Sequence, residues 1–253
     1  MRSSLRKIIL STLGNFKSIS NSIHILNSHY IGIENLPQEN FYDLLKKLSK
    51  QADFIRIEDA VSAIQNKTHQ NQKLIAFSFD DGFEECHTKI APVLESFKTN
   101  AAFFINPGFV DGDKKYINNF NQNIVHVNKK PMTWQMIQDL HARGFIIGNH
   151  TFDHAKLINL STEELEKQIV QSKLLIESKT GTPCNYFAWT YGELNDIDKP
   201  ALELALKEHS FVFSSANYTN YYSFNNAVFN RRHIEGDWPI SHIKYFLSKS
   251  KNY

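Results

Sequence analysis

The stretch LIAFSFDDGF, from Leu74 to Phe83, decides the fold predicted for this chain. Its first six residues, Leu74–Phe79, are mostly apolar and lack the alternation of a strand with one solvated face. They therefore predict a strand that is buried on both sides. Two adjacent carboxylates, Asp80 and Asp81, follow this strand directly. Carboxylates at the edge of a core need a cation, a metal ion or hydrogen bonds, unless one of them simply caps the following helix.

Strand-like and helix-like segments alternate on both sides of this stretch. Such alternation predicts an α/β protein in which helices cover a parallel sheet, and 253 residues is an ordinary length for a single α/β barrel. Thr133, and Ser161 with Glu164, are typical of helix N-termini. The other expected strands are 23–26, 101–105, 145–148, 186–189, 211–213 and 228–234, and the expected helices lie near 41–48, 57–64, 90–97, 134–143, 161–181, 202–206 and 240–247.

The segment 109–131 is polar and rich in asparagine, with no clear period. It is long for a connection inside a compact domain. We therefore expect a functional loop or a mobile insertion there.

Composition excludes several classes of function. A formal net charge of +2 provides no basic field that would favour nucleic acid as a partner. Two cysteines, Cys86 and Cys184, form no metal motif and are too few for a disulfide scaffold, which fits a reducing compartment. No apolar run approaches the length of a membrane-spanning helix.

Residues 1–22 are predicted to form a basic helical extension that precedes a single domain at 23–253. The segment resembles the start of a signal peptide, but its apolar run, Ile8–Leu10, is too short and no small-residue cleavage site follows. We favour a helix packed by its few apolar residues, and the alternative is a helix that lies on an anionic membrane surface. The sequence thus predicts a cytoplasmic protein, with membrane association as the alternative. The basic residues are Arg2, Arg6, Lys7 and Lys17.

A second chemical motif, GNHTFDH, runs from Gly148 to His154. His150 and His154 are four residues apart, so on a helical turn both imidazoles would face the same side. With a carboxylate from elsewhere they would form a metal site that leaves positions open for water and substrate. The chain contains 11 histidines, so the alternative is a pair that arises by chance.

Three motifs together resemble the polysaccharide deacetylase family, which is also called the NodB-homology family or carbohydrate esterase family 4. SFDDG at 78–82 is similar to its first motif, HTFDH at 150–154 to its second, and FAWTYG at 187–192 to an arginine-free form of its third. The resemblance runs from about Ile23 to the C-terminus. It implies a distorted (β/α)7 TIM-like barrel and metal-dependent hydrolysis of acetyl groups on sugars.

The resemblance also implies roles for individual residues. Asp80 matches the general base, whereas Asp81, His150 and His154 match the ligands of one divalent metal ion. That ion is expected to be zinc, with cobalt, nickel or manganese as alternatives. The backbone N–H of Tyr191 matches the donor that stabilises the oxyanion. The metal would polarise the acetamide carbonyl while Asp80 removes a proton from the attacking water.

The chain departs from the family pattern at the arginine that holds the general base. The third motif often contains an arginine that holds the catalytic aspartate, and here residues 188–190 read Ala-Trp-Thr. Arg231 or Arg232 could supply the guanidinium from the last strand, where it would lower the pKa of Asp80 and orient its carboxylate. The alternative is that both arginines lie on the surface.

The general acid cannot be assigned from the sequence. The late Leu-x-His motif of the family is absent, and the candidates His29, His233 and His242 have no matching context. For each of them, a core or partly exposed histidine is the favoured interpretation.

Three functions remain open. The first is an N-deacetylase that acts on an N-acetylated sugar, oligosaccharide or glycolipid, with nucleic acid excluded as a partner. The second is an O-acetyl esterase with the same architecture. The third is a non-catalytic glycan-binding relative, which is disfavoured because Asp80 and all three metal-ligand positions are present.

Overall fold

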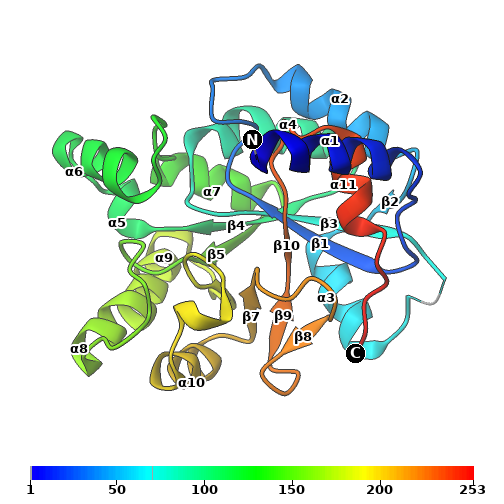
Figure 1. The fold of residues 1–253 in the computed structure, drawn as a ribbon. Coiled ribbons are helices and arrows are strands. Elements are labelled where there is room, and N and C mark those ends of the chain that lie inside the picture. The colour runs from blue at the N-terminus through cyan, green and yellow to red at the C-terminus, as the bar shows by residue number, and fades with distance from the viewer. Residues whose placement is uncertain (1, 70) are drawn as a thin grey trace.

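The computed structural model describes residues 2–69 and 71–253, and for residues 2–8 only the backbone. Parallel strands form one curled sheet in the order β10-β1-β3-β4-β5-β6-β7-β9-β8, with β2 beside β3 (Figure 1). Only the pair β8 and β9 is antiparallel among the described strands. The strands are β1 (Ile23–Ser28), β2 (Asp53–Phe54), β3 (Leu74–Phe79), β4 (Ala101–Ile105), β5 (Ile146–Asn149), β6 (Tyr186–Ala188), β7 (Phe211–Ser214), β8 (Tyr222–Ser223), β9 (Val228–Asn230) and β10 (Arg232–His233).

The segment that contains β9 and β10 connects the two edges of this sheet. β9 pairs with β7, whereas β10 pairs with β1, so seven parallel positions follow one another around a distorted barrel. The α/β barrel predicted from the sequence is confirmed. The prediction of one uninterrupted strand over 228–234 is wrong, because the chain changes its pairing partner at Arg231. There the backbone N–H of Arg231 donates to Ser214 O on the β7 side, and Ile234 N–H donates to Asn27 O on the β1 side.

Helices cover the outside of the barrel (Figure 1). The two predicted helix starts are confirmed: Thr133 Oγ1 accepts from Met136 N–H, and Ser161 and Glu164 form a capping box. The helices are α1 (Arg2–Asn15), α2 (Gln38–Leu48), α3 (Ile57–Asn66), α4 (Ala91–Ser96), α5 (Pro107–Val110), α6 (Lys114–Asn119), α7 (Trp134–Ala142), α8 (Thr162–Leu165), α9 (Ser172–Thr180), α10 (Lys199–Glu208) and α11 (Ile240–Leu247), with π-helical turns at Cys86–Ile90, Phe120–Ile124 and Glu166–Gln171 and a 3-10 turn at Leu194–Asp196.

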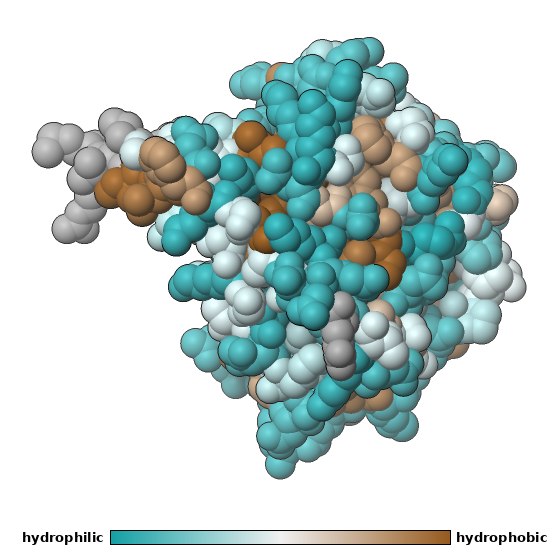
Figure 2. All heavy atoms as spheres, turned by 90° about the vertical axis from the view of Figure 1, so that its right-hand side faces the viewer, coloured by the Kyte–Doolittle hydropathy of each residue, from teal (hydrophilic) through white to brown (hydrophobic). Residues whose placement is uncertain are grey.

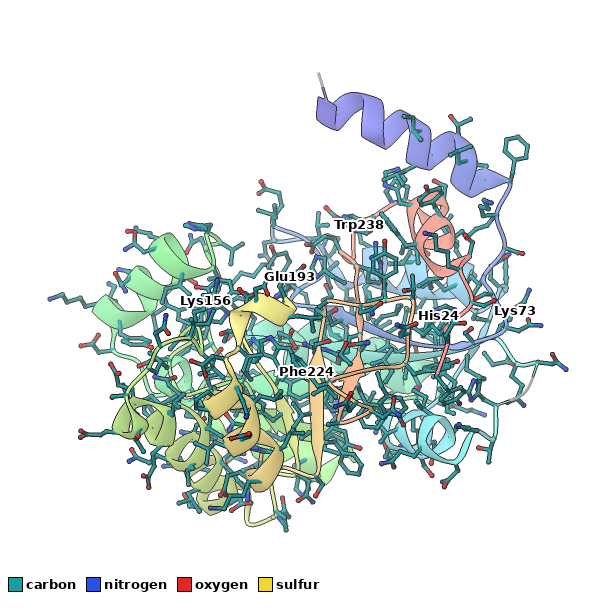
Figure 3. The ribbon with its side chains drawn as sticks, turned by 60° about the horizontal axis from the view of Figure 1, so that its bottom comes forward. His24, Lys73, Lys156, Glu193, Phe224 and Trp238 are labelled. Atoms are coloured by element: carbon teal, nitrogen blue, oxygen red, sulfur yellow. The ribbon has the colours of Figure 1, made fainter. Side chains whose placement is uncertain are left out.

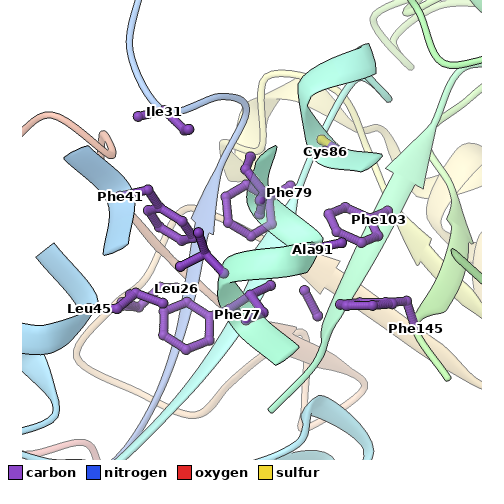
Figure 4. Close-up of a cluster of buried hydrophobic side chains, with 14 of the residues drawn as sticks. Leu26, Ile31, Phe41, Leu45, Phe77, Phe79, Cys86, Ala91, Phe103 and Phe145 are labelled. Carbon is purple, nitrogen blue, oxygen red and sulfur yellow. The ribbon is translucent and has the colours of Figure 1, made fainter. Parts of the chain in front are cut away.

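Strand β3 is buried on both faces, as predicted. Phe77 and Phe79 belong to the apolar layer beneath the outer helices, whereas Ala76 belongs to the layer inside the barrel. In Figure 4, Phe79 lies between Phe41 of α2 and Phe103 of β4, with ring centroids 5.9 and 5.7 Å away. Apolar contact on both faces explains why the strand shows no polar alternation. It also fixes the strand that carries the two aspartates.

The segment 109–131 is partly helical, so the expectation of a loop throughout is wrong. Its functional role stays a prediction. It contains the end of α5, the helix α6 and the π-helical turn Phe120–Ile124, whereas residues 111–113 and 125–131 lie outside these helices. Phe109 and Phe120 stack with their ring centroids 4.0 Å apart and pack with Phe83 in one apolar cluster. Few apolar residues occur in this segment, and asparagines separate them, so the sequence shows no helical periodicity of apolar residues. The segment forms an ordered wall beside the strand ends.

The N-terminal helix α1 packs against α11. Ser11 Oγ and His242 Nε2 lie 2.9 Å apart, and a Cβ built on Gly14 would stand 1.8 Å from Ser241 O. Only glycine permits this close approach of the two backbones. Figure 3 shows α1 resting on α11 while its N-terminal part extends away from the rest of the chain. No described helix has both the length and the apolar character needed to cross a membrane.

Candidate active site

Residues that follow different strands converge on one cavity of about 420 Å³. Asp80 and Asp81 follow β3, His150 follows β5, and Tyr191 follows β6. All four line the cavity, as does His154. The carboxyl ends of parallel strands meet at one edge of a barrel, which is where such folds do their chemistry. The predicted site residues are therefore brought together.

Asp81, His150 and His154 form a compact group of potential metal ligands. Their ligand atoms all lie within 4.8 Å of one another, and all three residues are buried. Asp81 Oδ1 lies 3.5 Å from His150 Nε2 and 3.3 Å from His154 Nε2. Asp81 has a φ of 70°, and a Cβ on the following Gly82 would stand 2.9 Å from Ile105 Cγ2. Backbone strain at this turn is typical of functional sites.

His150 is oriented by the backbone of the next strand. Its Nδ1 lies 2.6 Å from Ala188 O, a distance at which Nδ1–H donates and Nε2 is left with a free lone pair. Burial lowers the pKa of His150 to about 4, although the charges of Asp80 and Asp81 oppose this shift. The ring is therefore neutral at neutral pH. A neutral imidazole is the form that binds a metal.

His154 reaches the group by a route that the sequence did not indicate. The prediction of a helical turn over 150–154 is wrong, because the segment is an irregular loop in which Thr151 and His154 have φ values of 65° and 64°. Asn106 at the end of β4 holds this loop by donating to the carbonyl oxygens of His150 and Thr151. Left-handed residues and a side-chain clamp thus bring the two imidazoles together.

The donor set fits a divalent metal ion. Asp81 Oδ1 is buried and has no hydrogen-bond partner, although two ring nitrogens face it. A buried carboxylate oxygen without a partner is costly. Burial alone would raise the pKa of Asp81, but the adjacent imidazole of His154 outweighs burial and lowers it. One carboxylate and two imidazoles that point at a common position are a typical ligand set for a divalent metal ion with open positions.

Asp80 is held by Arg231 rather than by the metal-ligand group. Arg231 Nη1 donates to Asp80 Oδ1 at 2.7 Å and Nη2 donates to Oδ2 at 2.8 Å, and the arginine is fully buried. Arg231 Nη1 also donates to Ser78 Oγ at 3.1 Å. Burial raises the pKa of Asp80, but the Arg231 charge more than offsets burial and keeps it below its usual value. The carboxylate is therefore ionised and fixed in orientation.

Of the two arginines that the sequence left open, only Arg231 points inward to Asp80. The guanidinium of Arg232 lies 3.8 Å from the ring centre of Tyr218 and 3.9 Å from that of Phe246. The surface alternative is wrong for Arg231, which has no exposed area. Arg231 lies between β9 and β10 and Arg232 begins β10, and their side chains contact different groups.

Tyr191 lies at the mouth of the cavity. It has a φ of 65°, and its side chain is 56% exposed while its ring packs edge-on against His154 at 5.0 Å. The neighbouring residues Gly192 and Glu193 also line the cavity. The third motif thus borders the predicted metal site, as the other two do.

The three candidate acid histidines separate in the structure. His29 and His233 line the cavity, with ring centroids 5.5 Å apart, whereas His242 is buried beside Ser11 on the outer helix α11. His233 Nε2 lies 2.8 Å from Glu235 Oε1, so this carboxylate fixes the ring.

Two further residues position the loops of the site. Asn106 clamps the histidine loop; its place directly after the strand at 101–105 predicts that it lies near the other strand-end residues, although it does not predict this contact. Glu85 accepts from Ile31 N–H at 2.6 Å and from Lys129 Nζ at 2.8 Å, which ties two loops beside the cavity. Nothing in the spacing of Glu85 and Lys129 indicates this pair.

A barrel with one carboxylate and two histidines at its strand ends is typical of metal-dependent hydrolases. Residues 67–207 match the family model for polysaccharide deacetylase, and the chain belongs to that family.

Known proteins of this kind are similar to the chain over part of their length. It is 26% identical over 166 residues to the peptidoglycan-N-acetylmuramic acid deacetylase PdaC of Bacillus subtilis, a match that covers 65% of this chain and 31% of PdaC. It is 30% identical over 127 residues to a peptidoglycan-N-acetylglucosamine deacetylase of Bacillus cereus, which covers 50% of each. The chain thus spans about a third to a half of the length of these relatives.

Solved structures share the fold. IcaB from Ammonifex degensii has a TM-score of 0.70 at 18% identity, over 92% of this chain and 99% of that one. The deacetylase PplD of Streptococcus pyogenes, solved with acetate, has a TM-score of 0.69 at 16% identity, over 89% of this chain and 97% of that one.

Proposed function

We propose that this protein is a metal-dependent N-deacetylase that removes acetate from an N-acetylated amino sugar in a glycan or glycolipid precursor. The observation that carries the proposal is the separation of roles within the Asp80–Asp81 pair. The carboxylate of Asp81 and the imidazoles of His150 and His154 could bind the same ion, whereas Arg231 holds the carboxylate of Asp80 beside them. A carboxylate that is ionised, oriented and kept apart from the ligands is suited to proton transfer.

Asp81, His150 and His154 would hold one divalent ion. Zinc suits a site of two nitrogens and one oxygen with open positions, and cobalt, nickel and manganese are alternatives. When bound, such an ion acts as a Lewis acid toward the acetamide carbonyl and increases the acidity of water. The remaining chemistry falls to the side chains and backbone of the chain itself.

We assign Asp80 as the general base. Water attacks the carbonyl carbon of the acetamide while Asp80 accepts a proton from it, the C–N bond breaks, and acetate and a free amine leave. The bidentate contact with Arg231 occupies one lone pair on each oxygen of Asp80, and a carboxylate has about four such sites. Asp80 can therefore accept the proton while the contact remains in place.

The backbone N–H of Tyr191 is proposed to stabilise the negative charge that grows on the carbonyl oxygen. Support comes from the place of Tyr191 at the cavity mouth and from its left-handed φ of 65°. Donors that are fixed before the reaction need no reorganisation during it.

The departing nitrogen needs a proton, and we propose His233 as its source. His233 and Glu235 both line the cavity, and the carboxylate of Glu235 orients the imidazole of His233. An imidazole that is held in this way is suited to donate a proton. Return of the proton from Asp80 is the alternative, and His242 is excluded by its place on the outer helix α11.

The sugar, its linkage and its carrier remain proposals. The names of the relatives refer to N-acetylmuramic acid and N-acetylglucosamine of peptidoglycan, which supports an N-acetylhexosamine as the group acted on. The cytoplasmic location predicted from the sequence stays a prediction.

The test compares amide and ester substrates. Acetate release is measured from N-acetylglucosamine oligosaccharides and from matched O-acetylated sugars. We expect release from the amides. Release from the esters alone would support the O-acetyl esterase, and glycan binding without release from either would support the non-catalytic relative.

A further inference from the structure

One face of α1 carries apolar side chains that stay exposed in the structure. Ile9 and Leu13 are each 45% exposed, and Phe16 directly after the helix is 87% exposed. Ile9 and Leu13 are four residues apart and so lie on one side of α1, and Phe16 follows in the turn that ends the helix. Isolated exposed apolar residues are ordinary, but an aligned row marks an interaction surface. We call these three residues the α1 stripe.

The opposite face of α1 is already occupied. Leu10 is 9% exposed, Gly14 closely approaches the backbone of α11, and Ser11 lies against His242. Lys244 Nζ also donates to Asn15 O at 3.2 Å. The helix is therefore anchored along one side, so the α1 stripe is held outward. Figure 2 shows brown hydrophobic surface on the part of the molecule that projects beside the atoms drawn in grey.

The two ends of the sequence carry basic residues and no acidic ones. All 26 acidic residues lie between Glu34 and Asp237. Residues 1–33 contain four basic residues and residues 238–253 contain three, which leaves 21 basic residues in the acidic middle of the chain. Lys17 and Lys249 are exposed, and Ser20 Oγ donates to Lys249 O, so both lysines lie near the end of α1. The apolar stripe thus belongs to the basic part of the chain.

We propose that the α1 stripe docks the protein on an anionic lipid surface. Helices that lie in the plane of a membrane interface combine an apolar side with a basic polar face. The α1 sequence contains three basic residues and no acidic one. Exposed lysines near the stripe are attracted to anionic headgroups, and the apolar side chains enter the boundary between headgroups and acyl chains. Because α1 is fixed to α11, docking would hold the whole barrel at the membrane. This inference does not depend on the enzymatic activity proposed above.

The test is cosedimentation of the full chain with vesicles of phosphatidylcholine, with and without phosphatidylglycerol. We expect binding to the anionic vesicles, and we expect it to weaken when phosphatidylglycerol is omitted or salt is raised. The double variant Leu13→Ser/Phe16→Ser should lower the vesicle partition coefficient by about tenfold or more, because it removes two apolar side chains that would be buried in the membrane. Leu174→Ser removes a leucine that is 56% exposed on α9 and should change nothing.

Two control measurements show whether the double variant still folds and remains active. Far-ultraviolet circular dichroism and acetate release from a soluble substrate should be unchanged in the double variant, because neither residue lines the cavity. Equal vesicle binding by the wild type and the double variant would overturn the proposal. So would a wild type that ignores anionic vesicles but forms a dimer that the double variant abolishes, because the α1 stripe would then bind a second copy of the chain.

Discussion

Arg231 and Asp80 are 151 positions apart in the sequence and form a buried bidentate ion pair, with N–O distances of 2.7 and 2.8 Å. The arginine lies where the last strand changes its pairing partner from β7 to β1. Arg231 therefore lies at the change of strand pairing and also orients the carboxylate of the proposed base. A planar guanidinium suits this double contact, which a lysine cannot reproduce.

Replacing Arg231 by lysine should lower kcat/KM for deacetylation by about tenfold to a thousandfold. The positive charge is kept, but the carboxylate of Asp80 loses its fixed orientation. Arg231→Gln should in addition destabilise the fold by about 3 kcal/mol or more, because a buried charge is left unpaired. Steady-state kinetics and thermal unfolding measure the two effects separately.

Arg232→Lys is the matched control for the lysine variant. It makes the same change at the next residue, whose guanidinium lies over two aromatic rings. We expect near-normal kcat. Equal losses in the two variants would show that the ion pair with Asp80 has no special part in the reaction.

Asp80→Asn should leave one metal ion bound and lower kcat by at least about a hundredfold, because an amide cannot accept the proton. Metal content by elemental analysis and acetate release should be measured on the same preparation. Near-normal acetate release from this variant would mean that Asp80 is not the base.

His154→Ala should weaken metal binding by about tenfold or more, since one of three protein ligands is lost. Competition with a chelator of known affinity gives the dissociation constant. His126→Ala removes an exposed histidine outside the cavity and should bind metal like the wild type. An unchanged affinity in His154→Ala would exclude this residue from the ligand set.

Acidification should destabilise the fold through His209. Burial lowers the pKa of this histidine from 6.5 to about 4, and its Nδ1 lies 3.2 Å from Ala205 O. Between these values the unfolded chain binds a proton that the folded chain does not, so the free energy of unfolding falls as pH falls. From about pH 7 to about pH 5 the loss should be about 2 kcal/mol.

Denaturant unfolding at a series of pH values measures this loss. His209→Gln removes the titrating group, so its free energy of unfolding should depend less on pH over the same range. A pH dependence identical to that of the wild type would show that His209 does not titrate as described.

Much of the site could be predicted from the sequence because its residues stand at the ends of buried strands. The apolar run of β3 fixed the position of Asp80 and Asp81, and four-residue spacing identified His150 and His154. The route by which the histidines meet could not be predicted, since it depends on left-handed residues and on Asn106 from another strand. Local spacing carries no information about such long-range contacts.

The break at Arg231 and the fold of 109–131 were missed for related reasons. Strand pairing that switches from β7 to β1 is decided by distant segments, so an apolar pattern over 228–234 reads as one strand. In 109–131, Phe109 and Phe120 gain their burial from each other and from Phe83. Both features are products of tertiary contact.

The most direct test of the central claim is acetate release from an N-acetylglucosamine oligosaccharide before and after the metal is removed. We predict that the protein as purified, with one divalent ion per chain, releases acetate and free amine in equal amounts. Chelation should abolish this release, and zinc should restore it. Undiminished release from metal-free protein would contradict the account, because Asp81, His150 and His154 would then have no metal to hold during the reaction.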